Sequence, residues 1–88
     1  MTYSDLFTPK AVRSLRRLLR AVGPRISEAL KTLERSPETG EQLTPSRFWK
    51  IRVGDHRVVY EIDRPESRVI VLFVGHGKNV YDEFSRLL

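Results

Sequence analysis

The chain has 88 residues and no cysteine, and its 16 Lys and Arg side chains exceed its 11 Asp and Glu side chains, which leaves a formal net charge of +5 at pH 7. This length allows one compact domain over the whole chain, and the lack of cysteine excludes disulfides, thiolate metal sites and cysteine nucleophiles. The positive charge favours an anionic partner, with nucleic acid first and an acidic protein segment second. The first residues resemble no signal peptide and no apolar run is long enough to span a membrane, so we expect a cytoplasmic protein with no membrane partner.

The first part of the chain predicts a short strand followed by a helical hairpin. Residues 3 to 7 are suited to the strand, and Thr8 and Pro9 suit the N-cap and the first position of a helix. Apolar residues then recur at spacings of three and four in two runs. Gly23 and Pro24 separate the runs and predict the end of one helix and the start of the next. The first run is Val12, Leu15, Leu18, Leu19 and Val22, and the second is Ile26, Ala29, Leu30 and Leu33.

The second part of the chain predicts an antiparallel meander and a closing helix. Residues 36 to 46 contain two prolines and one glycine among polar residues, which is typical of an irregular connection. Three strands follow, at about residues 49 to 53, 56 to 62 and 68 to 76, and residues 79 to 88 carry apolar side chains at helical spacing. The last strand is apolar on both faces and is therefore expected in the interior of the sheet.

Together these elements predict an α+β fold in a single domain. Its sheet would be small, four-stranded, mixed and mainly antiparallel, with the α-hairpin on one face and a short C-terminal helix. If the first strand pairs alongside the last long strand, the sheet is mixed, with an antiparallel meander from residues 47 to 76. The face of the sheet away from the α-hairpin is expected to stay open.

Three cations fall on that open face. Side chains alternate along a strand, so Lys50 and Arg52 point away from the apolar side of their strand, and Arg57 lies beside them on the next strand. The opposite side carries the residues expected in the core, Trp49, Ile51, Val53, His56, Val58 and Tyr60. The three cations are therefore either a phosphate-binding surface or a solvated sheet face.

The sequence WKIRVGDHRVVYEI, residues 49 to 62, resembles the signature of the RelE/ParE superfamily of toxins. The resemblance continues through VLFVGH at residues 71 to 76 and the Val-Tyr pair at residues 80 and 81, and the order of elements also agrees. It implies a RelE-like fold and the toxin component of a type II toxin–antitoxin system, neutralised by a cognate antitoxin. RelE-like members are ribosome-dependent endoribonucleases that cut mRNA, whereas ParE-like members poison DNA gyrase.

The resemblance also implies roles for particular residues. Lys50 and Arg52 resemble the basic pair of the family's second strand, Arg57 the arginine that holds the phosphate, and Tyr81 the tyrosine of the closing helix. After the Val-Gly-His sequence the RelE-like pattern commonly has an arginine. This chain has Gly77 there, followed by Lys78, which would supply a positive charge for RNA one residue further on.

Cleaving RNA without a metal or other cofactor requires three tasks: removal of the 2′-hydroxyl proton, stabilisation of the phosphorane and protonation of the leaving 5′-oxygen. Arg57 suits the second task, because a planar guanidinium binds two phosphoryl oxygens and stays protonated. Lys50 and Arg52 would add positive charge. His76 and Tyr81 are joint candidates for the two proton transfers, and their acid and base roles stay open.

Two further alternatives remain open. Arg13, Arg16, Arg17 and Arg20 on the first helix are either a solvated face or a surface for ribosomal RNA or acidic parts of the antitoxin. For the whole chain, an endoribonuclease toxin is the first expectation. A gyrase inhibitor without nuclease activity and a non-catalytic basic module that binds RNA or protein are the alternatives.

Overall fold

A computed structural model describes residues 2–43 and 47–77 of the chain. In chain order its elements are β1 (Ser4–Phe7), α1 (Pro9–Arg35), the short 3-10 helix η1 (Pro37–Thr39), β2 (Glu41–Gln42), β3 (Phe48–Val53), β4 (His56–Asp63) and β5 (Arg68–His76). None of the helices in this part of the chain is both long and apolar enough to cross a membrane. The helix expected at residues 79 to 88 lies outside the described residues.

The strands form one five-stranded sheet in the order β1-β5-β4-β3-β2. β1 pairs with β5 in parallel, and the other neighbouring strands pair antiparallel. The mixed sheet, the meander and the interior position of residues 68 to 76 therefore agree with the sequence analysis. The predicted number of four strands is wrong, because Glu41 and Gln42 in the irregular connection pair with β3 as a short fifth strand.

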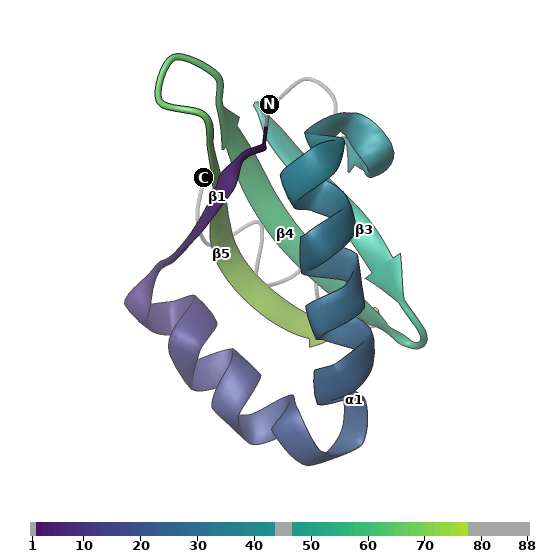
Figure 1. Cartoon of the computed structure of the whole chain (residues 1–88). Coiled ribbons are helices and arrows are strands. Elements are labelled where there is room, and N and C mark those ends of the chain that lie inside the picture. The colour runs from purple at the N-terminus through teal and green to yellow at the C-terminus, as the bar shows by residue number, and fades with distance from the viewer. Residues whose placement is uncertain (1, 44–46, 78–88) are drawn as a thin grey trace.

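Helix α1 begins as its sequence predicts, with the Thr8 side chain accepting a hydrogen bond from the backbone N–H of Ala11 at 3.1 Å. It does not end at Gly23: helical residues continue to Arg35, with Pro24 inside the helix. Its axis nevertheless bends sharply midway, so that α1 has two arms, as expected for the α-hairpin (Figure 1). Proline removes a backbone donor and crowds the preceding turn, which is the usual cause of such a bend.

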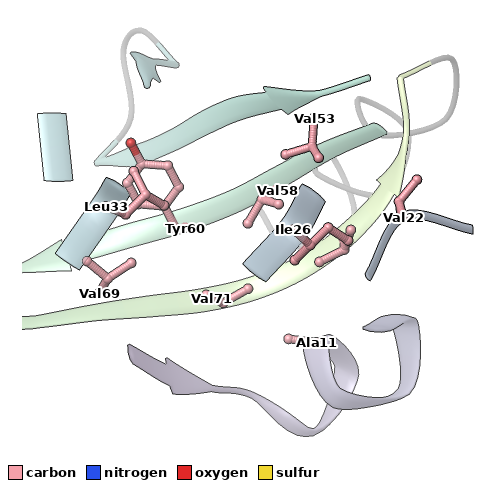
Figure 2. Packing of buried hydrophobic residues seen from close by; sticks show 10 residues of the cluster. Ala11, Val22, Ile26, Leu33, Val53, Val58, Tyr60, Val69 and Val71 are labelled. Atoms are coloured by element: carbon pink, nitrogen blue, oxygen red, sulfur yellow. The ribbon is translucent and has the colours of Figure 1, made fainter. Parts of the chain in front are cut away.

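The main core lies between α1 and the sheet (Figure 2). Its buried residues come from both arms of α1 and from the three long strands: Ala11, Val22, Ile26, Leu33, Val53, Val58, Tyr60, Val69, Val71 and Val74. The second arm of α1 crosses the sheet over β3 and β4, whereas the first arm lies beside the C-terminal half of β5 (Figure 1). The core positions expected from alternation in β3 and β4 are thus on the side covered by α1.

The second face of the sheet is not fully open, which corrects the sequence-based expectation. Phe48, Val59 and Phe73 form a separate buried cluster there, with Leu43 and Leu72 packed against it. A shift in the pairing of β4 with β5 explains how β5 serves both faces. Val59 pairs with Phe73 but Tyr60 pairs with Val71, which leaves Leu72 as a bulge and places Val71 and Phe73 on opposite faces.

Candidate phosphate-binding site

The three strand cations lie together on the face of the sheet away from α1. Arg52 pairs directly with Arg57 and Lys50 pairs with Val59, and opposite residues of an antiparallel pair point to the same side. The three cations line one hollow of about 470 Å³. The residues that form its walls are Thr39, Gly40, Glu41, Lys50, Ile51, Arg52 and Arg57. The structure therefore brings the three predicted phosphate-binding residues into one place, and their role in binding stays a prediction.

Backbone carbonyls hold the two arginines. The Arg52 Nε donates a hydrogen bond to the carbonyl oxygen of Gly54 at 3.0 Å, and the Arg57 Nη1 donates to the carbonyl oxygen of His56 at 3.0 Å. A weaker contact of 3.5 Å joins Arg57 Nη1 to the same Gly54 oxygen. In the described part of the chain neither guanidinium has a carboxylate partner. Like charges directly opposite one another destabilise a strand pair, so a bound anion would relieve this repulsion.

Lys50 has a carboxylate neighbour that the sequence analysis missed. Glu41 pairs with Lys50 in register, and its Oε2 lies 4.0 Å from the Lys50 Nζ. The lysine side chain is only 16% exposed, whereas that of Glu41 is 77% exposed. Glu41 could not be found from periodicity, because a two-residue strand in a polar connection carries no repeating pattern. The hollow therefore contains one negative group at its rim.

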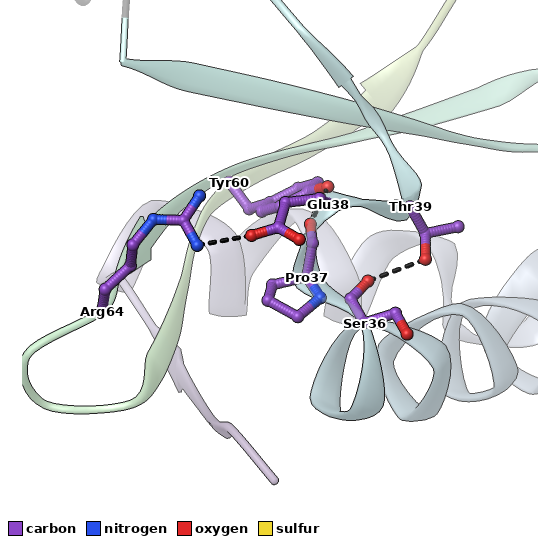
Figure 3. A network of polar contacts seen from close by, with 6 residues as sticks. All are labelled: Ser36, Pro37, Glu38, Thr39, Tyr60 and Arg64. Carbon is purple, nitrogen blue, oxygen red and sulfur yellow. Dashed lines mark hydrogen bonds and ion pairs between the residues drawn. The ribbon is translucent and has the colours of Figure 1, made fainter. Parts of the chain in front are cut away.

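A buried tyrosine fixes the wall of the hollow that leads to Glu41, and Figure 3 shows its hydroxyl group bonded to Pro37. The fully buried Tyr60 donates its hydroxyl hydrogen to the carbonyl oxygen of Pro37 at 2.7 Å and accepts a hydrogen bond from the Gly40 N–H at 3.2 Å. Burial is the main cause that raises the pKa of Tyr60 to about 12, so the phenol stays protonated. An ion pair between Glu38 and Arg64 holds the same segment from outside.

Gly40 permits this close approach. A Cβ atom at this position would lie 2.4 Å from both the Lys50 carbonyl oxygen and the Tyr60 hydroxyl oxygen, which is shorter than real contacts. Glycine is thus the residue type that lets η1 and β2 pack directly onto β3 and Tyr60. As a result, the wall of the hollow is attached to the same strands that carry the cations.

His76 does not join the cations on their face. It pairs with His56, and the two rings meet edge to face with centroids 5.5 Å apart. His56 in turn pairs with the core residue Val53, so both histidines point to the side of the sheet that α1 covers. The structure therefore does not bring His76, a candidate for proton transfer, to the face that carries Lys50, Arg52 and Arg57. Tyr81 and Lys78 lie outside the described residues.

Comparison with known proteins agrees with this fold. Residues 6–81 match the family described as the ParE toxin of type II toxin-antitoxin system, parDE. A search of curated proteins finds none that matches.

Several solved structures are similar. The toxin–antitoxin complex RelBE2 from Mycobacterium tuberculosis contains a chain with 30% identity and a TM-score of 0.77, covering 86% of this chain and 99% of that chain. A mutant of E. coli toxin RelE in the free state has 26% identity and a TM-score of 0.80, with 100% of both chains covered. The YoeB/ParE toxin from Agrobacterium tumefaciens, at 17% identity and a TM-score of 0.69 over 83% of this chain and 96% of that chain, shares the fold. The chain therefore belongs to the ParE toxin family of type II toxin–antitoxin systems, within the RelE/ParE superfamily.

Proposed function

We propose that this toxin is a metal-independent endoribonuclease that cleaves mRNA on the ribosome. The observation that supports it is the hollow in which Lys50, Arg52 and Arg57 meet. Two of these cations are held by carbonyl oxygens and, among the described residues, lack carboxylate partners. A rigid cluster of positive charge is suited to a phosphodiester, because its donors need no rearrangement as negative charge develops.

In this proposal the 2′-oxygen attacks the adjacent phosphorus, and the bond from phosphorus to the 5′-oxygen breaks. Arg57 contacts two phosphoryl oxygens of the phosphorane, and Lys50 and Arg52 stabilise the added negative charge. The 2′-hydroxyl proton goes to a base and the leaving 5′-oxygen receives a proton from an acid. Tyr81 stays a candidate for these transfers, and Glu41 is added because it lines the same hollow as the cations, whereas His76 points to the other face of the sheet.

The cognate partner in this proposal is an antitoxin protein. Solved relatives include toxin–antitoxin complexes from M. tuberculosis and E. coli, and a mutant of the E. coli toxin RelE in complex with an antitoxin peptide. For this chain we propose that an antitoxin segment covers the cationic hollow. Covering Lys50, Arg52 and Arg57 would block access of RNA without any change in the toxin fold.

A ParE-like inhibitor of DNA gyrase is the second candidate. The family that matches residues 6–81 is described as ParE toxin, and two features of the site weaken the case for cleavage. His76 points to the other face of the sheet, and Gly77 stands where the RelE-like pattern commonly has an arginine. Gyrase inhibition would need the fold and an antitoxin, but not the cationic hollow.

Induced expression in a bacterium separates the two candidates. The Arg57→Ala variant should fail to arrest translation, since loss of one such preorganised charge typically costs on the order of a hundredfold to a thousandfold in rate. Arg35→Ala, which removes an exposed arginine that does not line the hollow, is the matched control and should remain toxic. Primer extension should detect new transcript ends with the wild type and the control only. Filamentation with a DNA-damage response, unchanged by Arg57→Ala, would instead identify gyrase as the target.

A further inference from the structure

The first arm of α1 carries a concentration of positive charge that the hollow on the sheet does not use. Between Asp5 and Glu28 the chain has six cationic side chains and no acidic one. Four of them, Arg13, Arg16, Arg17 and Arg20, are all exposed, and each lies three residues from one of the others and four from another. Side chains at this spacing share one face of a helix, so the four form a continuous group, here named the arginine stripe.

Nothing in the described part of the chain balances the arginine stripe. None of its four members forms an ion pair or a side-chain hydrogen bond there. Like charges three and four residues apart destabilise a helix, so the arrangement opposes the stability of this arm. The second arm is different, because Lys31 has Glu28 and Glu34 three residues away on either side. A solvated helix face usually mixes both signs of charge in this way.

The stripe also has a shaped surface. A hollow of about 490 Å³ is lined by Lys10, Arg13, Ser14, Arg16 and Arg17, and it shares no lining residue with the hollow on the sheet. Ser14 is only 1% exposed and donates its hydroxyl hydrogen to the Lys10 carbonyl oxygen at 2.9 Å. The Lys10 Nζ lies 5.5 Å from the centroid of the Phe73 ring, which places this cation at the border of the second face of the sheet.

We infer that the arginine stripe and its hollow bind the phosphate backbone of a single RNA strand, as an anion-binding surface separate from the hollow on the sheet. Guanidinium groups bind phosphate with two parallel hydrogen bonds, and the stripe consists of arginine alone. Arg13 and Arg17 are about 6 Å apart along the helix axis, which gives a regular row of donors for a regularly charged polymer.

An acidic protein fits this surface less well than RNA. Protein interfaces depend on a buried apolar or aromatic centre, whereas binding to a nucleic-acid backbone depends chiefly on cations. Among the side chains whose exposure the structure describes, Leu6 is the only large hydrophobic one that is exposed, and it lies on β1 outside the stripe. The hollow of the stripe, lined by four cations and one serine, therefore offers charge without an apolar anchor.

The test uses a 2′-O-methyl-uridine 20-mer as the probe, because this RNA analogue cannot be cleaved and reports binding alone. The Arg13→Gln/Arg17→Gln variant should lower the slope of log affinity against log salt concentration by about 1.4, since each single-strand phosphate contact contributes about 0.7. Lys31→Gln/Arg35→Gln removes the same charge from the second arm and should leave the slope unchanged. Equal slopes for these two variants would overturn the inference. The inference would also be overturned if the stripe variant lost binding to a polyglutamate probe but kept its binding to RNA.

The same assay separates this inference from the proposed function. Arg52→Gln/Arg57→Gln tests the hollow on the sheet, and its effect should add to that of the stripe variant, because the two surfaces share no lining residue. If only the stripe variant lowers the slope, the stripe binds RNA and the proposed nuclease site loses its support. If Arg57→Ala abolishes transcript cleavage but the stripe variant binds as the control does, only the inference about the stripe is wrong.

Discussion

The guanidinium of Arg57 lies against the backbone of Gly77. A Cβ atom at position 77 would lie 3.4 Å from both Cζ and Nη1 of Arg57 and 3.2 Å from the carbonyl oxygen of Asp55. The Gly77 N–H donates a hydrogen bond to that same Asp55 oxygen at 2.8 Å, which ties the end of β5 to the turn between β3 and β4. Arg57 therefore occupies the space that the side chain of a larger residue at position 77 would enter.

This contact predicts that Gly77→Ala weakens RNA binding. The added methyl group would crowd the Asp55 carbonyl, which must give by a few tenths of an ångström, and would contact the Arg57 guanidinium, so the surroundings that hold the arginine change. Gly75→Ala is a close control, because Gly75 pairs with Arg57 but a Cβ there meets nothing within 4 Å. Binding of the 2′-O-methyl RNA probe should fall for Gly77→Ala and stay unchanged for Gly75→Ala. Equal binding by both variants would show that Arg57 is not fixed by this contact.

Tyr60→Phe should destabilise the fold through loss of one hydroxyl group. The substitution leaves the Pro37 carbonyl and the Gly40 N–H without their partner in a buried place, which costs about 1–3 kcal/mol. Urea denaturation measures the change in the free energy of unfolding. Tyr3→Phe, at a partly buried tyrosine, serves as the control and should cost less. If the two variants were equally stable, the hydrogen bonds of Tyr60 would not be what holds the wall of the hollow.

The raised pKa of Asp5 predicts that the free energy of unfolding falls as the pH rises from about 4 to about 7. Burial, followed by a hydrogen bond to Glu34 and the charge of Glu34, raises the pKa of Asp5 from 3.8 to about 7. The folded state thus keeps a proton that the unfolded state releases near pH 3.8, so stability falls through this window and is lowest above it. Asp5→Asn removes the ionisation and should flatten this part of the curve of unfolding free energy against pH. A variant curve with the same slope as the wild type would assign the decline to another group.

Asp63 should give a pH dependence of the opposite sign, because its pKa is lowered. The hydrogen bond from Arg68 is the first cause that lowers the pKa of Asp63 below 3.8. The folded state here releases its proton more readily than the unfolded state, so this contribution is present above about pH 4 and is lost on acidification. Asp63→Asn should therefore reduce stability near neutral pH and make little difference in acid, the reverse of Asp5→Asn.

The periodic spacing of apolar residues predicted the helix and the strands whose sequences show such a repeat. The apolar spacing of α1 and the alternation in β3 and β4 identified both the core and the face that carries Lys50, Arg52 and Arg57. Alternation could not predict the bulge at Leu72, because the shift depends on how β5 pairs with β4 rather than on its own residues. It also could not predict β2. There, Gly40 and the hydroxyl of Tyr60, 20 residues apart in the chain, join two segments through a contact that no local pattern encodes.

The direction of the His76 side chain could not be predicted from the sequence either. His76 is a candidate for proton transfer because of its residue type, but the face on which it lies is set by pairing with His56. An interaction of this kind becomes visible only when the register of β4 and β5 is known. Resemblance to a family supplies residue types along a chain, whereas the direction of each side chain depends on strand pairing.

Glu41→Gln provides a direct test of how the carboxylate acts in the hollow. The side chain is exposed and its contact with Lys50 is long, at 4.0 Å, so its removal should change the free energy of unfolding by less than about 1 kcal/mol. Because the hollow would lose its negative group, the 2′-O-methyl RNA probe should bind more tightly and with a steeper dependence on salt. Transcript cleavage after induction then separates two roles. If cleavage rises with binding, Glu41 only repels the substrate; if cleavage falls while binding tightens, Glu41 takes part in proton transfer. Weaker binding by the variant would contradict the placement of the phosphate beside Lys50.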